Sequence, residues 1–293
     1  MQKIMPCLWF DNQSEEAAKL YTSLFDDSRV EHTSRYGEAG PRPKGSVMTV
    51  TFRLMGQSFM ALNGGPQFSF TPATSFFVGC TTEEEIDRLW RELSKGGKVL
   101  MELATYPFSR KFGWASDRFG VSWQLNLADT GKGISPFLMF VGKQHGKAED
   151  AMKSYVSLFK GSRIEQVERY GAERPDETAG TVVHGRFSLA GQTFLTMDSA
   201  RDHHFTFTPA ISFFVNCGTQ EEVDELWDKL SAGGAKGQCG WLEDRYGVSW
   251  QIVPTALGEM LQDSDAAKSK RVMNAMLKMT KLDIATLRKA WEG

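Results

Sequence analysis

An internal repeat constrains the fold of this chain more than any other feature of its sequence. The segment DRFGVSWQL at residues 117–125 recurs as DRYGVSWQI at 244–252, and FTPATSFFV at 70–78 recurs as FTPAISFFV at 207–215. Such self-similarity indicates that one structural plan is built twice. A chain of 293 residues has room for two domains, each able to bury its own apolar core.

Each repeat is predicted to contain two βαβββ units. In the first unit, an apolar strand at 4–10 precedes a helix whose apolar residues recur at helical spacing, and strand-like segments follow at 28–36, 47–54 and 58–63. The alternation in the strand at 47–54 predicts core residues on one face and polar residues on the other. The expected core residues are Met48, Val50, Phe52 and Leu54.

The second unit begins with the strand SFFVGC at 75–80. Thr82 and Glu85 match a capping box, which predicts a helix that ends at the glycine pair 96–97. Three short strands are expected at 98–104, 112–116 and 121–127. The second repeat follows the same plan with one difference in length. Between the glycine pair and the tryptophan of the last hairpin, the first repeat has sixteen residues and the second has only AKGQCG. The two halves are therefore expected to differ at one end.

The repeats and their flanks give the expected domain boundaries. The last segment has apolar residues at helical spacing, which predicts two or three helices that dock onto a sheet or a partner chain. We expect a first βαβββ-βαβββ domain at 1–128, a linker at 129–133, a second such domain at 134–254 and a helical extension at 255–293.

Composition narrows the classes of partner. The net charge is -2, so no basic surface for nucleic acid is expected. The 4 cysteines lack the close spacing of zinc or redox motifs, which favours reduced and mostly buried thiols. The N-terminal apolar run is too short for a signal peptide, and no window is long enough to span a membrane. We therefore expect a soluble cytoplasmic protein that binds neither nucleic acid nor membrane.

The motifs together resemble one known superfamily. An A-x-x-L-Y-x-S-L-F helix at 17–25, an RYG strand at 35–37 and the D-R-[FY]-G-V-S-W-Q hairpin are similar to those of the vicinal oxygen chelate proteins, and within them to the PhnB-like proteins labelled as 3-demethylubiquinone-9 3-methyltransferase domains. The resemblance implies an α+β fold in which four βαβββ modules form two cup-shaped mixed β-sheets with helices outside. The tandem repeat would be pseudo-twofold, with the C-terminal helices added.

The resemblance also implies where a metal would bind. Enzymes of the superfamily usually chelate a divalent metal with a glutamate on the last strand, and Gln124 and Gln251 hold that position here. The same enzymes have histidine ligands on other strands, and the matching positions here hold residues that do not bind metals. An amide oxygen is also a weaker ligand than a carboxylate. We therefore expect no metal and no other cofactor. A glycine-rich turn between strand and helix, which would cradle S-adenosylmethionine, is not found in the sequence either.

Strand register predicts which side chains line the cups. Ser122 and Gln124 alternate with Trp123, a core residue, so we expect them and their counterparts to point into the cups. His184 and Arg186 either line a pocket or lie on a solvated edge. The full set of candidates is Trp9, Thr49, Thr51, Arg53, Ser122, Gln124, His184, Arg186, Asp198, Ser249 and Gln251, with Tyr106 and Phe108 as a lid in the long segment of the first repeat.

These patterns favour a PhnB-like protein that binds a small organic molecule without metal. The alternative is a metal-dependent lyase, isomerase or dioxygenase for a small oxygenated metabolite, with metal held by an atypical set such as Gln251, His184 and Asp198. A third possibility keeps activity in one repeat and makes the other a scaffold. The duplication predicts an internal pseudo-dimer, with further homodimerisation open. Whether each cup is built within one repeat or from exchanged units is also open.

Overall fold

The computed structural model describes residues 2–128 and 131–293. It contains the four predicted βαβββ units. The first repeat forms β1 (Ile4–Phe10), α1 (Ser14–Leu24), β2 (Arg29–Arg35), β3 (Val47–Leu54) and β4 (Gln57–Asn63), followed by β5 (Thr74–Cys80), α2 (Glu83–Ser94), β6 (Lys98–Tyr106), β7 (Ser109–Ser116) and β8 (Ser122–Leu127).

The second repeat has the same element order, with two very short strands in its last unit. It forms β9 (Gly133–Phe140), a 3-10 turn η1 (Gly142–Gln144), α3 (Ala148–Leu158), β10 (Arg163–Arg169), β11 (Val182–Leu189) and β12 (Gln192–Asp198), followed by β13 (Ile211–Cys217), α4 (Gln220–Ser231), β14 (Ala235–Lys236), β15 (Trp241–Glu243) and β16 (Ser249–Pro254). Residues 129–130 of the expected linker lie outside the described residues, and Gly133 already belongs to β9.

The two sheets combine units from different repeats. One has the order β14-β15-β16-β13-β1-β4-β3-β2 and holds the first and fourth units, whereas the other has the order β10-β11-β12-β9-β5-β8-β7-β6 and holds the second and third. Antiparallel pairing of β1 with β13, and of β5 with β9, joins the units at the centre of each sheet. We call the concave face of the first sheet cup A and that of the second cup B. The cups are therefore built from exchanged units.

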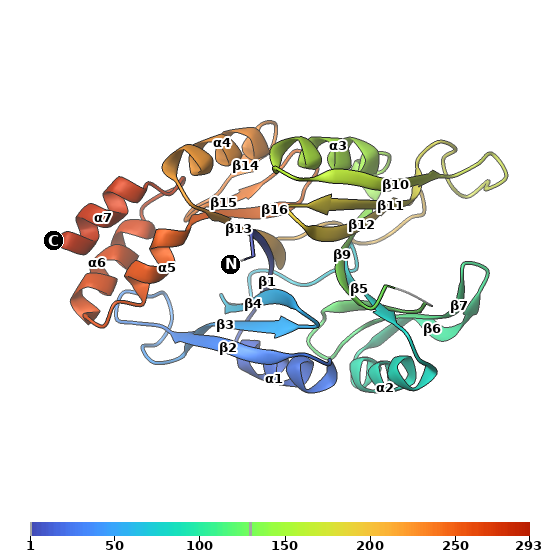
Figure 1. The fold of residues 1–293 in the computed structure, drawn as a ribbon, viewed down its shortest axis with the longest axis horizontal. Helices are drawn as coiled ribbons and strands as arrows, with labels where there is room; N and C mark the ends of the chain where they lie inside the picture. Colours follow the sequence, from blue (N-terminus) through green and yellow to red (C-terminus); the bar gives the residue numbers. More distant parts are fainter. Residues whose placement is uncertain (1, 129–130) are drawn as a thin grey trace.

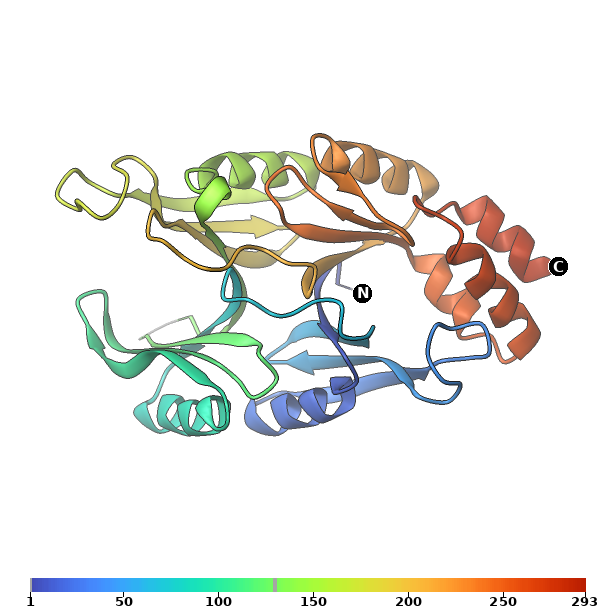
Figure 2. The ribbon, with the colours of Figure 1, turned by 180° about the vertical axis from the view of Figure 1, so that it is seen from behind.

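The helices cover the outer faces of the sheets. Figure 1 shows α1 and α2 on one side of the molecule and α3 and α4 on the opposite side, with the strands between them. Seen from behind, in Figure 2, the N-terminus again lies between the two layers. The two large apolar cores lie under these helices, and each takes nearly all its residues from one repeat. Each repeat thus keeps its own core while sharing both sheets.

The repeated DR[FY]GVSW motif forms a buried hydrogen-bond network that explains its residue types. Asp244 accepts hydrogen bonds from Tyr155 Oη at 2.6 Å and from Trp250 Nε1 at 2.8 Å. Asp117 accepts the same pair of bonds from Tyr21 at 2.7 Å and Trp123 at 2.9 Å. The tyrosine belongs to the first helix of its repeat and the aspartate to the last hairpin. The motif therefore links units that lie in different sheets.

A helix cap and a glycine pair end the helix α2 where the sequence predicts its two ends. Thr82 Oγ1 accepts a hydrogen bond from the backbone N–H of Glu85 at 3.1 Å, so α2 begins at the predicted capping box. A Cβ added to Gly97 would lie 2.0 Å from the carbonyl oxygen of Ser116. Only glycine allows the chain leaving α2 to pass that close to the end of β7.

Three helices follow the last strand, α5 (Thr255–Leu261), α6 (Ala266–Met276) and α7 (Ile284–Glu292). Their apolar residues form a separate small core with Val253 and pack against Phe214 of β13, so they dock onto the first sheet as predicted. Figure 1 shows them at one end of the molecule, next to β14, β15 and β16. Within the described ranges, no helix is long and apolar enough to cross a membrane.

Candidate functional site

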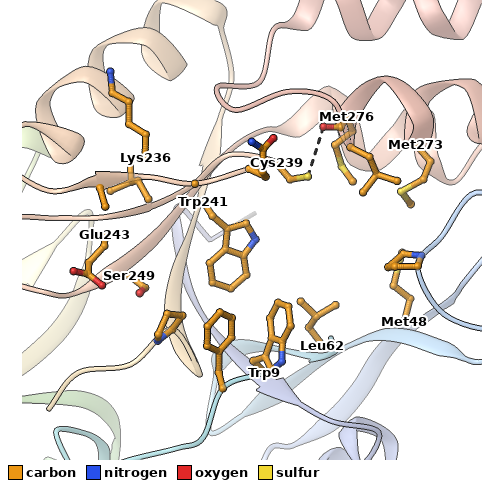
Figure 3. Close-up of a pocket in the computed structure, with 18 of the residues that line it drawn as sticks. Trp9, Met48, Leu62, Lys236, Cys239, Trp241, Glu243, Ser249, Met273 and Met276 are labelled. Atoms are coloured by element: carbon orange, nitrogen blue, oxygen red, sulfur yellow. Dashed lines mark hydrogen bonds between the residues drawn. The ribbon is translucent and has the colours of Figure 1, made fainter. Parts of the chain in front are cut away.

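Cup A contains a cavity of about 500 Å³. Strand pairing places Trp9 opposite Leu62, and Ser249 opposite Glu243, so these side chains share the concave face. Figure 3 shows Trp9, Leu62 and Trp241 among the side chains that line the cavity. The cavity walls come from the first and fourth units together with helix α6.

Aromatic rings form part of the wall of this cavity. The ring of Trp9 makes edge contacts with Phe68, at a centroid distance of 5.0 Å, and with Trp241 at 5.6 Å. Trp9 Nε1 donates a hydrogen bond of 2.8 Å to the carbonyl oxygen of Gly65. A Cβ on Gly64 would lie 2.1 Å from Trp9 Cζ2, so glycine is needed for the indole to lie there. The aromatic wall is thus fixed in position before any ligand binds.

The C-terminal helices close one side of the cavity mouth. Met273 and Met276 of α6, with Leu277 just after it, line the cavity. The shortened segment of the fourth unit holds this tail, because the backbone N–H of Cys239 donates to the carbonyl of Met279 at 2.8 Å and the next N–H donates to Thr280 at 2.7 Å. The tail therefore occupies the side of the cup that the short hairpin leaves open.

A strand irregularity brings Met48 to the cavity. Thr49 pairs with Ser34 and Val47 pairs with Arg35, so the register shift leaves Met48 without a partner. The prediction that Met48 belongs to the core with Val50 is wrong for this reason, and Met48 lines the cavity instead. Alternation alone cannot reveal such a bulge.

The inner wall of cup A holds neutral polar groups. Gln251 Nε2 donates to Ser212 Oγ at 2.9 Å, and both residues are buried. Cys7 lies beside them, and burial raises the pKa of its thiol to about 11 despite hydrogen bonds with Gln251 and Ser212. A divalent metal does not fit this set, because neither a carboxylate nor an imidazole is among the donors. Across residues 2–128 and 131–293, no group of three or more His, Cys, Asp and Glu side chains is placed to hold a metal ion.

Cup B has the same plan with different contents. Gln124 donates to Ser75 Oγ at 2.8 Å, as Gln251 does to Ser212 in cup A. Ser122 accepts a 2.8 Å hydrogen bond from Trp114 Nε1. An apolar cluster then covers the floor of this cup, formed by Phe137, Met139, Val141 and Leu195, with Phe77, Trp114, Met197 and Phe205 packed against them.

The remaining candidates on β3 and β11 lie on the concave faces but away from the cavity. Pairing places Thr49, Thr51 and Arg53 on the same face as Leu62, yet none of them lines the cavity of cup A. Arg186 is exposed on the edge of cup B, where it forms an ion pair with Glu165 at 2.9 Å. Burial lowers the pKa of its neighbour, His184, on the same strand.

The structure corrects the placement of Asp198. Its carboxylate faces helix α3 and accepts hydrogen bonds from the backbone N–H groups of Gly146 at 2.7 Å, Ala148 at 3.2 Å and Val182 at 2.9 Å. It is 1% exposed and does not line a cup. The atypical metal set of Gln251, His184 and Asp198 is also wrong, because Gln251 belongs to the first sheet and the other two to the second. The exchange of units separates them.

The predicted lid residues lie on a β-hairpin. The long segment of the first repeat forms β6 and β7 at the edge of the second sheet. The rings of Tyr106 and Phe108 stack at its tip with centroids 5.4 Å apart, and Phe108 is 67% exposed. The hairpin thus belongs to the sheet that forms cup B, whereas the C-terminal helices border cup A.

Sequence reasoning identified Trp9 and Ser249 as residues of this site but missed Trp241, Glu243 and Phe68. The strand Trp241–Glu243 has three residues, too short for an alternation pattern to be recognised. A signal does exist, because the first repeat has Ser116 where the second has Glu243. Differences between matching positions mark the places where the two cups have different walls.

Comparisons with known proteins agree with this architecture. The family model described as 3-demethylubiquinone-9 3-methyltransferase matches residues 2–126 and again residues 132–253. A Bacillus cereus protein described as a putative 3-demethylubiquinone-9 3-methyltransferase, PhnB protein, is 51% identical over 43% of this chain and 100% of its own, with a TM-score of 0.42. A Staphylococcus aureus protein is 40% identical over 43% of this chain and 97% of its own, with a TM-score of 0.19.

A more distant likeness concerns the whole fold. Glyoxalase I from Zea mays is 11% identical, covers 90% of this chain and 96% of its own, and gives a TM-score of 0.57. None of the curated proteins compared matches the chain. The two matches to one family model confirm the predicted tandem duplication and the predicted resemblance to 3-demethylubiquinone-9 3-methyltransferase domains. The chain therefore belongs to the 3-demethylubiquinone-9 3-methyltransferase family and has the vicinal oxygen chelate fold.

Proposed function

We propose that cup A binds a small organic molecule with a substantial apolar or aromatic surface, without a divalent metal. The observation that carries this proposal is the cavity of about 500 Å³ whose wall includes the contacting rings of Trp9 and Trp241. Small-molecule sites are typically concave, mostly apolar and provided with a few polar groups, and they range from roughly 300 to 1,000 Å³. Cup A has this size and composition.

The polar groups of cup A support binding without metal. The glutamate position of the metal-binding relatives holds Gln251, whose amide group is already hydrogen-bonded to Ser212. A metal there would be held by the amide oxygen of this glutamine, which is a weaker ligand than a carboxylate. We do not propose methyl transfer, because the sequence has no glycine-rich turn between a strand and a helix that could cradle a phosphate or S-adenosylmethionine.

The test compares one tryptophan in each cup. Trp241 and Trp114 hold matching positions, one in each last hairpin, and each pairs with the glutamine of its cup. Ligands found in a thermal-shift screen of a metabolite panel would be titrated against both alanine variants by calorimetry. We expect Trp241→Ala to weaken binding at least about tenfold, because a large ring contact is removed, whereas Trp114→Ala should change it less than about twofold.

Two results would contradict this proposal. Equal loss of binding in both alanine variants would show that the ligand does not select cup A. Stoichiometric zinc, iron, manganese or nickel in the purified protein, lost in Gln251→Ala, would favour the metal-dependent enzyme instead. Elemental analysis of the wild type and this variant measures that directly.

We also propose that the protein is cytoplasmic and that its two repeats form a pseudo-dimer within one chain. Each sheet already joins one unit from each repeat, so the pairing of two halves is satisfied within one chain. Light scattering distinguishes the cases: a mass near 32.8 kDa supports the pseudo-dimer alone, and twice that mass indicates further homodimerisation.

A further inference from the structure

One charged side chain faces the cavity of cup A. The cavity lining includes two charged residues, Lys236 and Glu243. Lys236 pairs with Leu242, whose side chain is buried in the core under α4, so the lysine side chain is on the outer face. Figure 3 shows Lys236 pointing away from Trp241, whereas Glu243 lies beside Ser249. The charge at the cavity wall is therefore negative.

Glu243 lacks a counterion. Other carboxylates near the cup are paired, as Glu38 is with Lys270 at 2.9 Å and Asp11 with Arg42 at 3.3 Å. Throughout the described part of the chain, no ion pair or hydrogen bond to the side chain of Glu243 is formed. Burial raises the pKa of its carboxyl, with no neighbouring cation to lower it. Glu243 is exposed at the mouth of the cavity, and a carboxylate without a partner there is stabilised when a cation arrives.

Aromatic rings lie across the same cavity. The cluster of Trp9, Phe68 and Trp241 presents ring faces and edges within one pocket. A cation over the face of an aromatic ring gains electrostatic stabilisation, most strongly with tryptophan. A carboxylate at the rim and tryptophans at the wall thus favour the same ligand charge.

We propose that the ligand of cup A is an organic cation, an amine or quaternary ammonium compound with an apolar or aromatic body. The charged group lies beside Glu243, and the body packs against the wall formed by Trp9 and Trp241, under the methionines of α6. This inference rests on the proposed function of cup A. An anionic ligand would face the unpaired carboxylate, and like charges in contact are unfavourable.

Cup B provides the internal contrast. The position of Glu243 is held there by Ser116, which pairs with Ser122 as Glu243 pairs with Ser249. The position of Trp9 is held by Met139, which belongs to the apolar cluster on the floor of cup B. The combination of carboxylate and tryptophan is thus particular to cup A, and cation binding is assigned to this cup alone.

The experiment compares two probes of equal shape. Benzyltrimethylammonium is a cation, and neopentylbenzene is its neutral isostere. Both are titrated by tryptophan fluorescence into the full-length wild type, Glu243→Gln and Glu259→Gln at low salt. The last variant removes one negative charge from an exposed residue of α5 outside the cavity lining, so it controls for net charge.

We expect the wild type and Glu259→Gln to bind the cation about tenfold more tightly than the neutral probe. In Glu243→Gln this preference should fall to about twofold or less, with binding of the neutral probe unchanged. Equal affinity of the wild type for both probes would overturn the inference while leaving the proposed function intact. A preference that survives in Glu243→Gln would overturn it as well. Failure of both probes to bind would reject the proposed function and the inference with it.

Discussion

Replacing Tyr155 by phenylalanine tests the role of the repeated motif in stability. The change removes only the hydroxyl group that donates to Asp244 at 2.6 Å. The ring stays in contact with Trp250, at a centroid distance of 5.2 Å, so packing is preserved. Tyr155 is 1% exposed and Asp244 is 3% exposed, so water does not replace the lost donor.

The expected loss follows from the number of donors that remain. A hydrogen bond to a charged group contributes about 1.5–3 kcal/mol. Asp244 keeps three others, from Trp250 Nε1 at 2.8 Å and from the backbone N–H groups of Tyr246 at 2.8 Å and Val248 at 3.1 Å. We therefore expect the lower part of the range, about 1.5–2 kcal/mol, which lowers the melting temperature of a chain of this size by roughly 3–8 °C.

The loss should depend on pH in a definite direction. Burial raises the pKa of the Asp244 carboxyl, and hydrogen bonds such as that from Tyr155 lower it in part. A carboxyl with a raised folded-state pKa contributes its stability below its ordinary pKa and loses it as the pH rises through the folded-state value. Tyr155→Phe raises this pKa further, so the variant should lose more stability at high pH than at low pH.

Urea denaturation of the wild type and the variant, followed at several pH values, measures both effects. Tyr21→Phe is the matched variant, because Tyr21 donates to Asp117 at 2.7 Å in the first repeat. Similar losses in both variants are expected. A change below about 0.5 kcal/mol in both would refute the view that this network stabilises the fold.

Three further predictions concern thiols, an ion pair and a glycine. Iodoacetamide at pH 8 should slowly label Cys239 and no other thiol in the native protein. The reason is that burial raises the pKa of Cys7 to about 11 and those of Cys80 and Cys217 to about 12. Two labels found by mass spectrometry would contradict this prediction. Hydrogen bonds with Lys270 and Lys44 lower the pKa of Glu38 to about 2. The ion pair between Glu38 and Lys270 of α6 therefore holds above about pH 4.5 and weakens as the pH falls towards 2. Lys270→Ala should raise the pKa of Glu38 in an NMR titration, and an unchanged value would argue against the pair. Gly234→Ala should lower the free energy of unfolding by about 2–3 kcal/mol in chemical denaturation, because the added Cβ would lie 2.0 Å from the carbonyl oxygen of Glu243. Gly258→Ala is the control and should cost nothing, because the space around Gly258 is open. Equal effects of the two changes would refute the clash.

The four units could be predicted because their signals are local. Apolar periodicity, the capping residues Thr82 and Thr219, and the glycine pairs each depend on neighbouring residues only. The same holds for the face assigned to Trp123 and Trp250, both of which are buried among the helices as expected. Local patterns therefore described the elements and their faces.

The pairing of units could not be predicted, because the two repeats offer identical partners. SFFV occurs at 75–78 in β5 and at 212–215 in β13, and either strand could pair with β1 without moving a side chain to another face. The structure pairs β1 with β13 and β5 with β9. The choice depends on contacts between distant parts of the chain, which a local pattern does not report.

The same limit explains the unrecognised part of the site. The sequence places Met273 and Met276 on a docking helix, as the structure confirms, but it does not say which cup lies beside that helix. The backbone bonds from Cys239 and Gly240 to Met279 and Thr280 decide this, and backbone groups leave no trace in a sequence. Glu243 faces the cavity through a strand of three residues, whose direction only the sheet register reveals.

The exchange of units has a consequence for how the two cups can change. In a symmetric pair of identical single-repeat chains, every substitution would appear in both cups at once. Here cup A is encoded by the first and fourth units and cup B by the second and third, so no stretch of sequence is used for both concave walls. A mutation at Trp241 or Glu243 can therefore alter one cup while leaving the other wall untouched. Joining the repeats in one chain thus allows the walls of the two cups to diverge independently.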